Sequence, residues 1–348
     1  MGEILGLGFT HGPFVLYPEE TFSQFLRRNL AHERTPPELR DPANWPGPMQ
    51  DEWSNDEGLT AAKEHRARLV AGFRKTRQLL DAFNPDVVVI WGDDQYENFH
   101  EDCVPAFCVY IEDEYHCQPF KGRGGPGGDP NAAVANVWGE GPEFTLSAKG
   151  HREAAKGLAN SLIESKIDIA YAYKQLHHNM GHAFWRSVAH LDYDRAGFPY
   201  PIIPFHVNCY GRRFSGGRSG DEFDPPAPSP ERCFEVGAAV AHYFADSPYR
   251  TALIGSSSWS HAFLTAKNHF LWPDVPSDKA RFEELKTGNL AAWKSIPLSQ
   301  IEDAGEHEML NWMCMAGAMH ELGRKPTYTE FIETWVSNST KVFAYFEP

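Results

Sequence analysis

Residues 84–99 read NPDVVVIWGDDQYENF, and this stretch decides the fold that we expect. Residues 86–91 form a short apolar run rich in β-branched side chains, which is typical of a strand covered on both faces. Gly92 then releases the backbone, and two carboxylates, an amide, a phenol and a third carboxylate follow at once. Ligands of open α/β sheets bind beyond the carboxyl ends of strands, so chemistry is expected here. For this segment taken alone, an ordinary strand-to-loop turn with solvated acids gives the same pattern.

Short apolar segments alternate with helical patterns along the rest of the chain. In the helix expected at residues 60–83, apolar residues recur at three- and four-residue spacing and so fall on one face. Further strands are expected at residues 4–9, 106–111, 167–173, 201–207 and 250–255, and further helices at 21–31, 147–164, 232–244 and within 305–318. No internal repeat or long linker interrupts this alternation. Residues 1–348 are therefore predicted to form a single three-layer α/β/α domain with a central mixed sheet and a loop insertion at 211–230.

The charge and composition of the chain exclude several classes of partner. The formal net charge is -15, so neither nucleic acid nor an anionic membrane surface is expected to bind. No apolar run approaches the ~20 residues that span a bilayer, and the opening residues MGEILGLGFTHGPF lack the pattern of a signal peptide. Six scattered cysteines without a C-x-x-C pair are typical of reduced thiols. A cytoplasmic location is therefore expected.

Three histidines follow expected strands in a similar way: His11, His182 and His261. An expected C-terminal helix adds Glu308. Two histidines and one carboxylate with open coordination positions suit a non-haem Fe(II) centre that handles O2, and spare histidines can serve as acid and base. Taken singly, each histidine is equally well explained as a hydrogen-bonded turn residue, so the evidence lies in their shared placement.

Five segments, in order over nearly the whole chain, resemble the class III extradiol ring-cleavage dioxygenases, in particular the protocatechuate and 3-O-methylgallate dioxygenases. The segments are GLGFTHGP, PDVVVIWGDDQYENF, GHAF, PIIPFHVNCY, and GSSSWSH followed by the G-x-x-E-x-x-N-W element at 305–312. The resemblance implies a single α/β domain, Fe(II), an aromatic substrate, O2, and cleavage of a catechol ring beside its two hydroxyls. It also implies a homodimer.

The resemblance assigns roles to the four residues that follow the strands. It implies that His11 and Glu308 are iron ligands and that His261 is the acid-base histidine. His182 corresponds to a second active-site histidine that contacts substrate or oxygen. Its neighbours differ from the Asp-His-Gly setting of related enzymes, so His178 remains a rival for this role.

The opening stretch departs from the family pattern at Gln95, where many relatives use a histidine as the second iron ligand. The GDDQ sequence is similar to the 3-O-methylgallate branch. The third ligand is then expected to be the Gln95 carbonyl oxygen or His65. Gln95 as a hydrogen-bonding neighbour of a ligand, and His65 as a surface residue of its helix, are the alternatives. Arg212 and Arg213 are candidate partners for a substrate carboxylate, against the alternative of solvated loop arginines.

The predicted function is Fe(II)-dependent extradiol cleavage, with O2, of a substituted and carboxylated catechol such as a gallate or protocatechuate derivative. A metal-assisted hydrolase or decarboxylase with the same fold is the first alternative, kept open by the substitution at Gln95. A non-catalytic binding protein is the second, since fold does not fix function. The joint presence of His11, His182, His261 and Glu308 argues against the second alternative.

Overall fold

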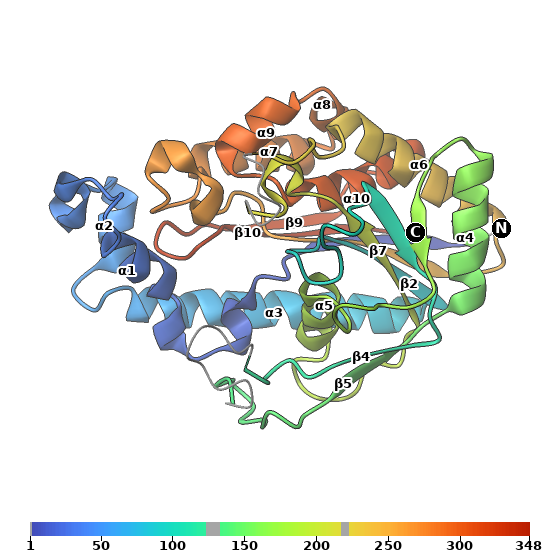
Figure 1. Cartoon of the computed structure of the whole chain (residues 1–348), viewed down its shortest axis with the longest axis horizontal. Helices are drawn as coiled ribbons and strands as arrows, with labels where there is room; N and C mark the ends of the chain where they lie inside the picture. The colour runs from blue at the N-terminus through green and yellow to red at the C-terminus, as the bar shows by residue number, and fades with distance from the viewer. Residues whose placement is uncertain (1, 123–132, 217–222) are drawn as a thin grey trace.

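The structure is a computed structural model that describes residues 2–122, 133–216 and 223–348. Its centre is an eight-stranded mixed sheet in the order β6-β3-β7-β2-β8-β1-β10-β9 (Figure 1). The strands are β1 (Ile4–Phe9), β2 (Val87–Gly92), β3 (Phe107–Tyr110), β6 (Ala170–Ala172), β7 (Ile202–Val207), β8 (Thr251–Ser256), β9 (Tyr328–Ile332) and β10 (Lys341–Phe346). The four neighbours β7, β2, β8 and β1 are parallel, so their carboxyl ends meet at one edge of the sheet.

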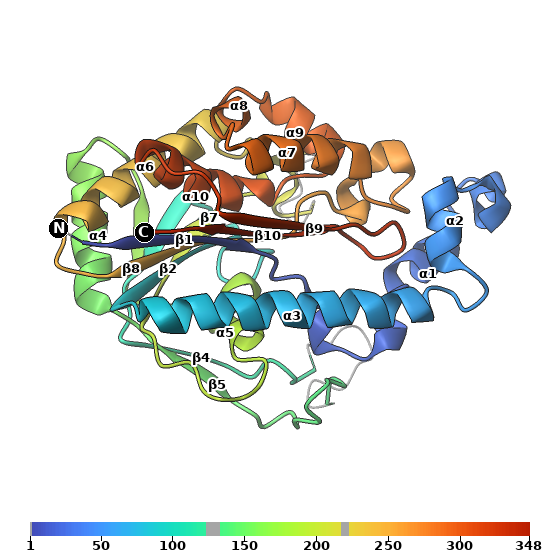
Figure 2. The same cartoon turned by 180° about the vertical axis from the view of Figure 1, so that it is seen from behind.

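Helices cover both faces of this sheet, which explains why every residue of β1, β2, β7, β8 and β10 is buried. One face carries α3 (Leu59–Phe83) and α5 (His182–Leu191), and the other carries α6 (Pro230–Asp246) and α10 (Met309–Glu321), as Figures 1 and 2 show from opposite sides. The predicted three-layer fold with a mixed sheet is confirmed.

The two helices on the second face approach each other unusually closely because glycines lie between them. A Cβ atom added to Gly237 of α6 would lie 1.8 Å from the backbone oxygen of Cys314 in α10. A Cβ atom at Gly317 of α10 would lie 2.4 Å from the backbone oxygen of Phe234 in α6. Any larger side chain at these positions would push α10 outward, and Glu308 directly precedes α10. The close packing therefore positions one of the candidate site residues.

The remaining elements surround this framework. They are α1 (Gln24–Leu30), α2 (Gly47–Trp53), α4 (Arg152–Glu164), α7 (Val275–Thr287), α8 (Ala291–Lys294), α9 (Leu298–Ala304) and a separate antiparallel pair, β4 (Glu114–Cys117) with β5 (Leu146–Lys149). The sequence analysis did not predict β4, β5, β9 or β10. Of the predicted insertion, residues 211–216 and 223–230 connect β7 to α6, and residues 217–222 lie outside the described part of the chain.

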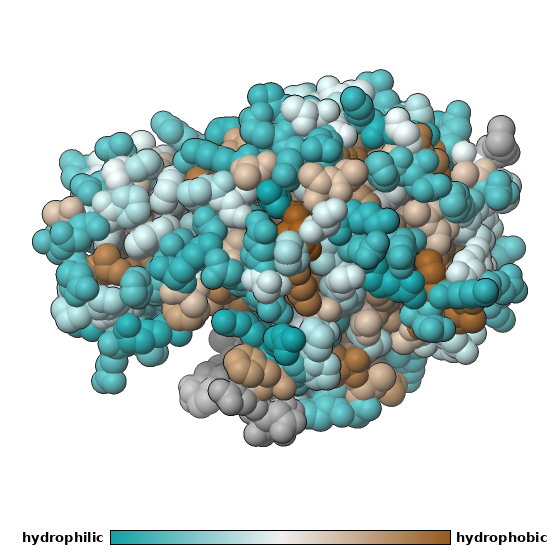
Figure 3. All heavy atoms as spheres, turned by 90° about the horizontal axis from the view of Figure 1, so that it is seen from above, coloured by the Kyte–Doolittle hydropathy of each residue, from teal (hydrophilic) through white to brown (hydrophobic). Residues whose placement is uncertain are grey.

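The face shown in Figure 3 is mainly hydrophilic, with apolar residues scattered over it in small groups. Within the described ranges, no helix combines the length and apolarity needed to cross a lipid bilayer.

Candidate metal centre

Side chains from four parts of the fold meet at the sheet edge where the parallel strands end. His11 follows β1 by two residues, and Asp93 is the first residue after β2. His182 is the first residue of α5, and Glu308 directly precedes α10. All four side chains are buried. The sheet thus gathers at one point residues that lie far apart in the sequence.

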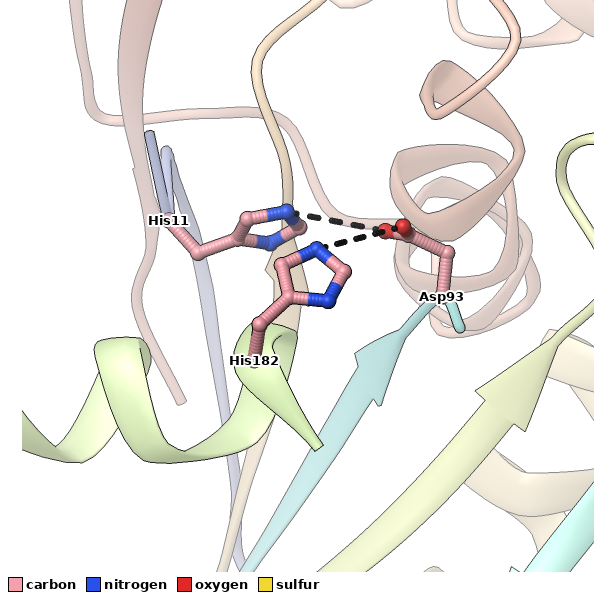
Figure 4. A group of neighbouring side chains, drawn as sticks. All are labelled: His11, Asp93 and His182. Atoms are coloured by element: carbon pink, nitrogen blue, oxygen red, sulfur yellow. Dashed lines mark ion pairs between the residues drawn. The ribbon is translucent and has the colours of Figure 1, made fainter. Parts of the chain in front are cut away.

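Figure 4 shows His11, Asp93 and His182 facing one another. The Nε2 atom of His11 lies 3.6 Å from Asp93 Oδ1, and the Nε2 atom of His182 lies 3.5 Å from Asp93 Oδ2. His11 Nε2 also lies 3.4 Å from Glu308 Oε2, which in turn lies 3.4 Å from His261 Nε2. These separations exceed those of good hydrogen bonds. The side chains therefore form a row in which imidazoles and carboxylates alternate: His261, Glu308, His11, Asp93 and His182, called the His-acid row below.

The three imidazoles of the His-acid row are oriented in the same way. His11 Nδ1 donates to the backbone oxygen of Ser256 at 2.9 Å, and His261 Nδ1 donates to that of Trp259 at 2.8 Å. His182 Nδ1 donates to a carboxylate oxygen of Glu97 at 2.6 Å. Because each Nδ1 carries the proton, each Nε2 presents a lone pair to the row, which is the state that binds a metal or accepts a proton.

Three atoms in the row fit a bound cation. Asp93 Oδ2, His182 Nε2 and Glu308 Oε2 have no hydrogen-bond partner among the described residues. A buried polar atom without a hydrogen-bond partner lowers the stability of a protein by about 1–3 kcal/mol. One group of His, Cys, Asp or Glu residues in the described chain brings ligand atoms within 4.8 Å of one another, and it consists of His11, Asp93 and His182. Imidazole nitrogens combined with carboxylate oxygens suit Fe(II).

The two carboxylates of the row have opposite pKa shifts. Burial raises the pKa of Asp93 well above its usual value, and the charge of Glu308 raises it further. Burial also acts to raise the pKa of Glu308, but His261, His11 and the Tyr210 hydroxyl outweigh it and hold that pKa below its usual value. A divalent cation would oppose both the burial and the repulsion that raise the pKa of Asp93.

Comparison with known proteins shows what the chain is similar to. Residues 224–341 match the family model of the catalytic LigB subunit of aromatic ring-opening dioxygenase. The matched segment contains His261 and Glu308. The resemblance inferred from the sequence is thus confirmed.

Three relatives of the family are named 2,3-dihydroxyphenylpropionate/2,3-dihydroxicinnamic acid 1,2-dioxygenase. The one from Pseudomonas putida, numbered 2, is 28% identical over 189 residues, which are 54% of this chain and 47% of the relative. Those from Paraburkholderia phymatum and Burkholderia vietnamiensis are each 25% identical and cover 78% and 76% of this chain, and 88% and 86% of their own lengths. The match thus spans about half of the first relative and most of the other two.

Gln95, the residue that departs from the family pattern, lies beside Glu308. Its amide nitrogen donates to the Tyr210 hydroxyl at 2.7 Å and to Glu308 Oε1 at 3.3 Å. The Tyr210 hydroxyl donates to the same Glu308 oxygen at 2.6 Å. In this arrangement Gln95 is a hydrogen-bonding neighbour of a carboxylate, which is one of the alternatives raised by the sequence.

The structure does not bring the other four candidates to the His-acid row. His65 is buried against the rings of Phe14 and Phe22, whose centroids lie 5.9 and 5.2 Å from that of its imidazole. His178 is partly buried, and its Nδ1 lies 3.2 Å from the backbone oxygen of Asn179. Arg212, whose Nε lies 3.7 Å from Glu302, and Arg213 are exposed. The arginines belong to a short 3-10 helix, Gly211–Arg213, whose side chains face solvent.

Sequence reasoning missed three residues that take part in the site: Asp93, Glu97 and Tyr210. Asp93 is the first polar residue beyond β2, so its position alone could have singled it out. Glu97 and Tyr210 lie further along the loops after β2 and β7, where the direction of a side chain depends on the path of the loop. Both lie in segments that the sequence analysis singled out, but no sequence pattern assigned a role to either residue.

Proposed function

We propose that this protein is an Fe(II)-dependent extradiol dioxygenase that uses O2 to open the ring of a substituted catechol. The His-acid row, with its unpartnered ligand atoms, is the observation that carries the proposal. The family match and the names of the relatives support the same chemistry. Substrates to be considered are gallate and protocatechuate derivatives and, from those names, dihydroxyphenylpropionates.

In this proposal His11, Glu308 and Asp93 hold the iron. His11 Nε2 faces both carboxylates, at 3.4 and 3.6 Å, and is therefore the central donor of the row. The amide of Asn311 donates to Asp93 Oδ1 at 3.0 Å and orients it. Fe(II) bound there would supply coordination positions for the two catechol oxygens and for O2. Asp93 would thereby replace the histidine ligand that this chain lacks at Gln95.

Two imidazoles are available for the two hydroxyl protons of a catechol. His261 is held by Trp259 with its Nε2 unprotonated, and it lines a cavity that opens beside the row. It can accept a hydroxyl proton and return it to the ring-opened product. His182, at the other end of the row, is paired with Glu97, whose negative charge stabilises the imidazolium formed when Nε2 accepts a proton.

The test is anaerobic reconstitution with Fe(II), followed by O2 uptake and absorbance of the ring-opened product across a panel of catechols. We expect O2 uptake only when iron and a catechol are both present. In His261→Ala, turnover should fall about 100-fold or more, while Fe(II) affinity stays within about threefold because His261 is not a proposed ligand. An iron-loaded protein that consumes no O2 with any catechol would contradict the proposal.

Metal-assisted hydrolysis or decarboxylation is a second candidate function. The observation that favours it is Asp93, which adds a second carboxylate to the row and makes it more like an oxygen-rich metal site. Product formation from a carboxylated aromatic under strict exclusion of O2 would identify this chemistry, and the same panel can be used to look for it.

A further inference from the structure

Lys341 is a buried lysine whose amine has no ion-pair partner among the described residues. It begins β10 and is 2% exposed. Its Nζ atom donates to the backbone oxygen of Ser339 at 2.6 Å and to the Ser337 hydroxyl at 3.1 Å, and no described carboxylate forms an ion pair with it. Buried charges in proteins are normally paired, because an unpaired one is costly. Within the described ranges, the fold therefore buries an amine that could be charged without a carboxylate paired to it.

The carboxylate that acts most on Lys341 is already occupied. Glu52 accepts hydrogen bonds from the Thr334 hydroxyl and from the backbone N–H groups of Trp335 and Val336. Burial lowers the pKa of Lys341 to about 7, although Glu52 acts to raise it. An anion that came into contact with Nζ would stabilise the charged form of the lysine.

A cavity of about 620 Å³ connects Lys341 with the His-acid row. His261 and Gly12, the residue after His11, line it together with Lys341. A Cβ atom at Gly12 would lie 3.9 Å from Lys341 Cε, so the lysine stem passes beside the loop that carries His11. The volume is within the about 300–1,000 Å³ that is typical of sites for small molecules.

The walls of the cavity suit an aromatic acid. Its apolar part comes from Phe14, Phe22 and Phe25, and its polar part from Lys341 and the serines beside it. The cavity lies between α1 and the loop that joins β9 to β10, which face each other at one end of the sheet (Figure 2). Two arginines of α1 also line it, but both are exposed, and one of them, Arg27, already pairs with Glu57 at 3.1 Å.

We propose that Lys341 binds a carboxylate on the substrate, so that the catechols accepted by this protein carry an anionic substituent on the ring. The inference rests on the proposed function for the catechol, which would lie with its hydroxyls at the His261 end. The carboxylate would reach Lys341 Nζ and supply the missing counter-ion, in a charge-assisted bond stronger than a neutral one. Lys341 thus takes the role that the sequence had suggested for Arg212 and Arg213, which are exposed.

The test compares 3,4-dihydroxybenzoate with its methyl ester, which differ in the carboxylate charge. Binding to the metal-free protein is measured by calorimetry, and kcat/KM is measured on the Fe(II)-loaded protein. For the wild type we expect the acid to be preferred by about 30-fold or more. Lys341→Met should remove this preference, because it should weaken the binding and lower the kcat/KM of the acid while leaving those of the ester unchanged. Arg28→Met, which removes an exposed cation at the same cavity, is the matched control and should keep the preference.

The outcomes separate this inference from the proposed function. Equal binding of acid and ester by the wild type would overturn it, even if Lys341→Met does not fold. The inference would also be overturned if Lys341→Met weakened the binding of acid and ester equally. A loss of the preference for the acid in Arg28→Met would overturn it as well. A preference for the acid that depends on Lys341, found in a protein that consumes no O2, would support the anion site and reject the dioxygenase.

Discussion

One carboxylate oxygen of Glu97 holds His182 at two points. Glu97 Oε2 lies 2.6 Å from His182 Nδ1 and accepts the backbone N–H of the same residue at 2.9 Å. It therefore fixes both the start of α5 and the direction of the imidazole, so that Nε2 faces Asp93. Burial lowers the pKa of His182 to about 4, with Glu97 opposing the shift, so the imidazole is neutral near pH 7.

Glu97→Gln should reduce turnover about 10- to 100-fold, the usual range when the partner of a site histidine is removed. The amide preserves the size of the side chain but removes the charge that stabilises a protonated His182. We expect the loss in kcat rather than in KM, measured by O2 uptake with saturating catechol. Glu114→Gln is the control, because it breaks an exposed pair with His116 at 3.3 Å and should leave kcat unchanged.

Asp93→Asn should weaken metal binding more than Gln95→Ala or His65→Ala. We expect a loss of about 100-fold or more for Asp93→Asn, since a proposed ligand is changed, and of about tenfold for Gln95→Ala, which touches Glu308. His65→Ala should change affinity little, because His65 packs against Phe14 and Phe22 and not against the His-acid row. Anaerobic titration with Fe(II) gives the three affinities directly. A larger loss in His65→Ala than in Asp93→Asn would reverse our assignment.

Removing the metal should lower the stability of the protein. A ligand that binds the folded state alone, at 100 times its Kd, contributes about 2.7 kcal/mol. In the absence of oxygen, we expect Fe(II) to raise the midpoint temperature of thermal unfolding. A chelator should bring this temperature back to the value of the metal-free protein. In Glu308→Gln the shift should be largely lost. An equal shift in that variant would mean that iron binds elsewhere.

His206 should make the protein sensitive to acid. It is buried in β7, and burial lowers its pKa to about 3. Between pH 3 and about 6.5 the unfolded chain therefore binds a proton that the folded protein does not, so stability falls as the pH falls, by about 1.4 kcal/mol per unit from this residue. The measurement is the free energy of unfolding in urea at several pH values from 6.5 to 4.5. In His206→Leu this free energy should fall less steeply with falling pH than in the wild type, by about 1.4 kcal/mol per pH unit. If the free energy of unfolding fell equally with pH in the variant and the wild type, His206 would not be a source of the acid sensitivity.

Gly237→Val should destabilise the protein by about 3 kcal/mol or more, because overpacking at a backbone contact forces α6 away from α10. The measurement is the free energy of unfolding in denaturant. Gly47→Ala is the matched control, since a Cβ atom there meets nothing within 4 Å, and its effect should stay within about 0.5 kcal/mol. Because α10 begins next to Glu308, Gly237→Val should also weaken iron binding.

The sequence predicts the centre of the fold well and its edge poorly. The strands β1, β2, β7 and β8 are continuous apolar runs, because they are buried on both faces, and such runs can be recognised locally. Residues of β9 are only partly buried, so its sequence shows no clear period. The apolar run of β10 follows predicted helices, and its antiparallel pairing with β1 is a long-range contact that no local pattern contains.

The candidate site shows the same division. Positions after strand ends led to His11, His182 and His261, and the structure brings these histidines together with Glu308. Which of two consecutive acids points inward could not be predicted, because it depends on the loop. Asp93 faces the row, whereas Asp94 accepts the backbone N–H groups of Glu97 and Asn98. The homodimer and the identity of the third ligand remain predictions.

The contact between His11 and Glu308 also constrains how the protein can be made. It joins a residue that follows β1 to one that comes after six of the eight strands of the sheet. A nascent chain on the ribosome therefore has no complete metal site until α10 has been synthesised and has docked against α6. Contacts between such distant residues form late and slow the folding of a domain. We therefore expect a metal ion to bind this site only after α10 has docked against the sheet.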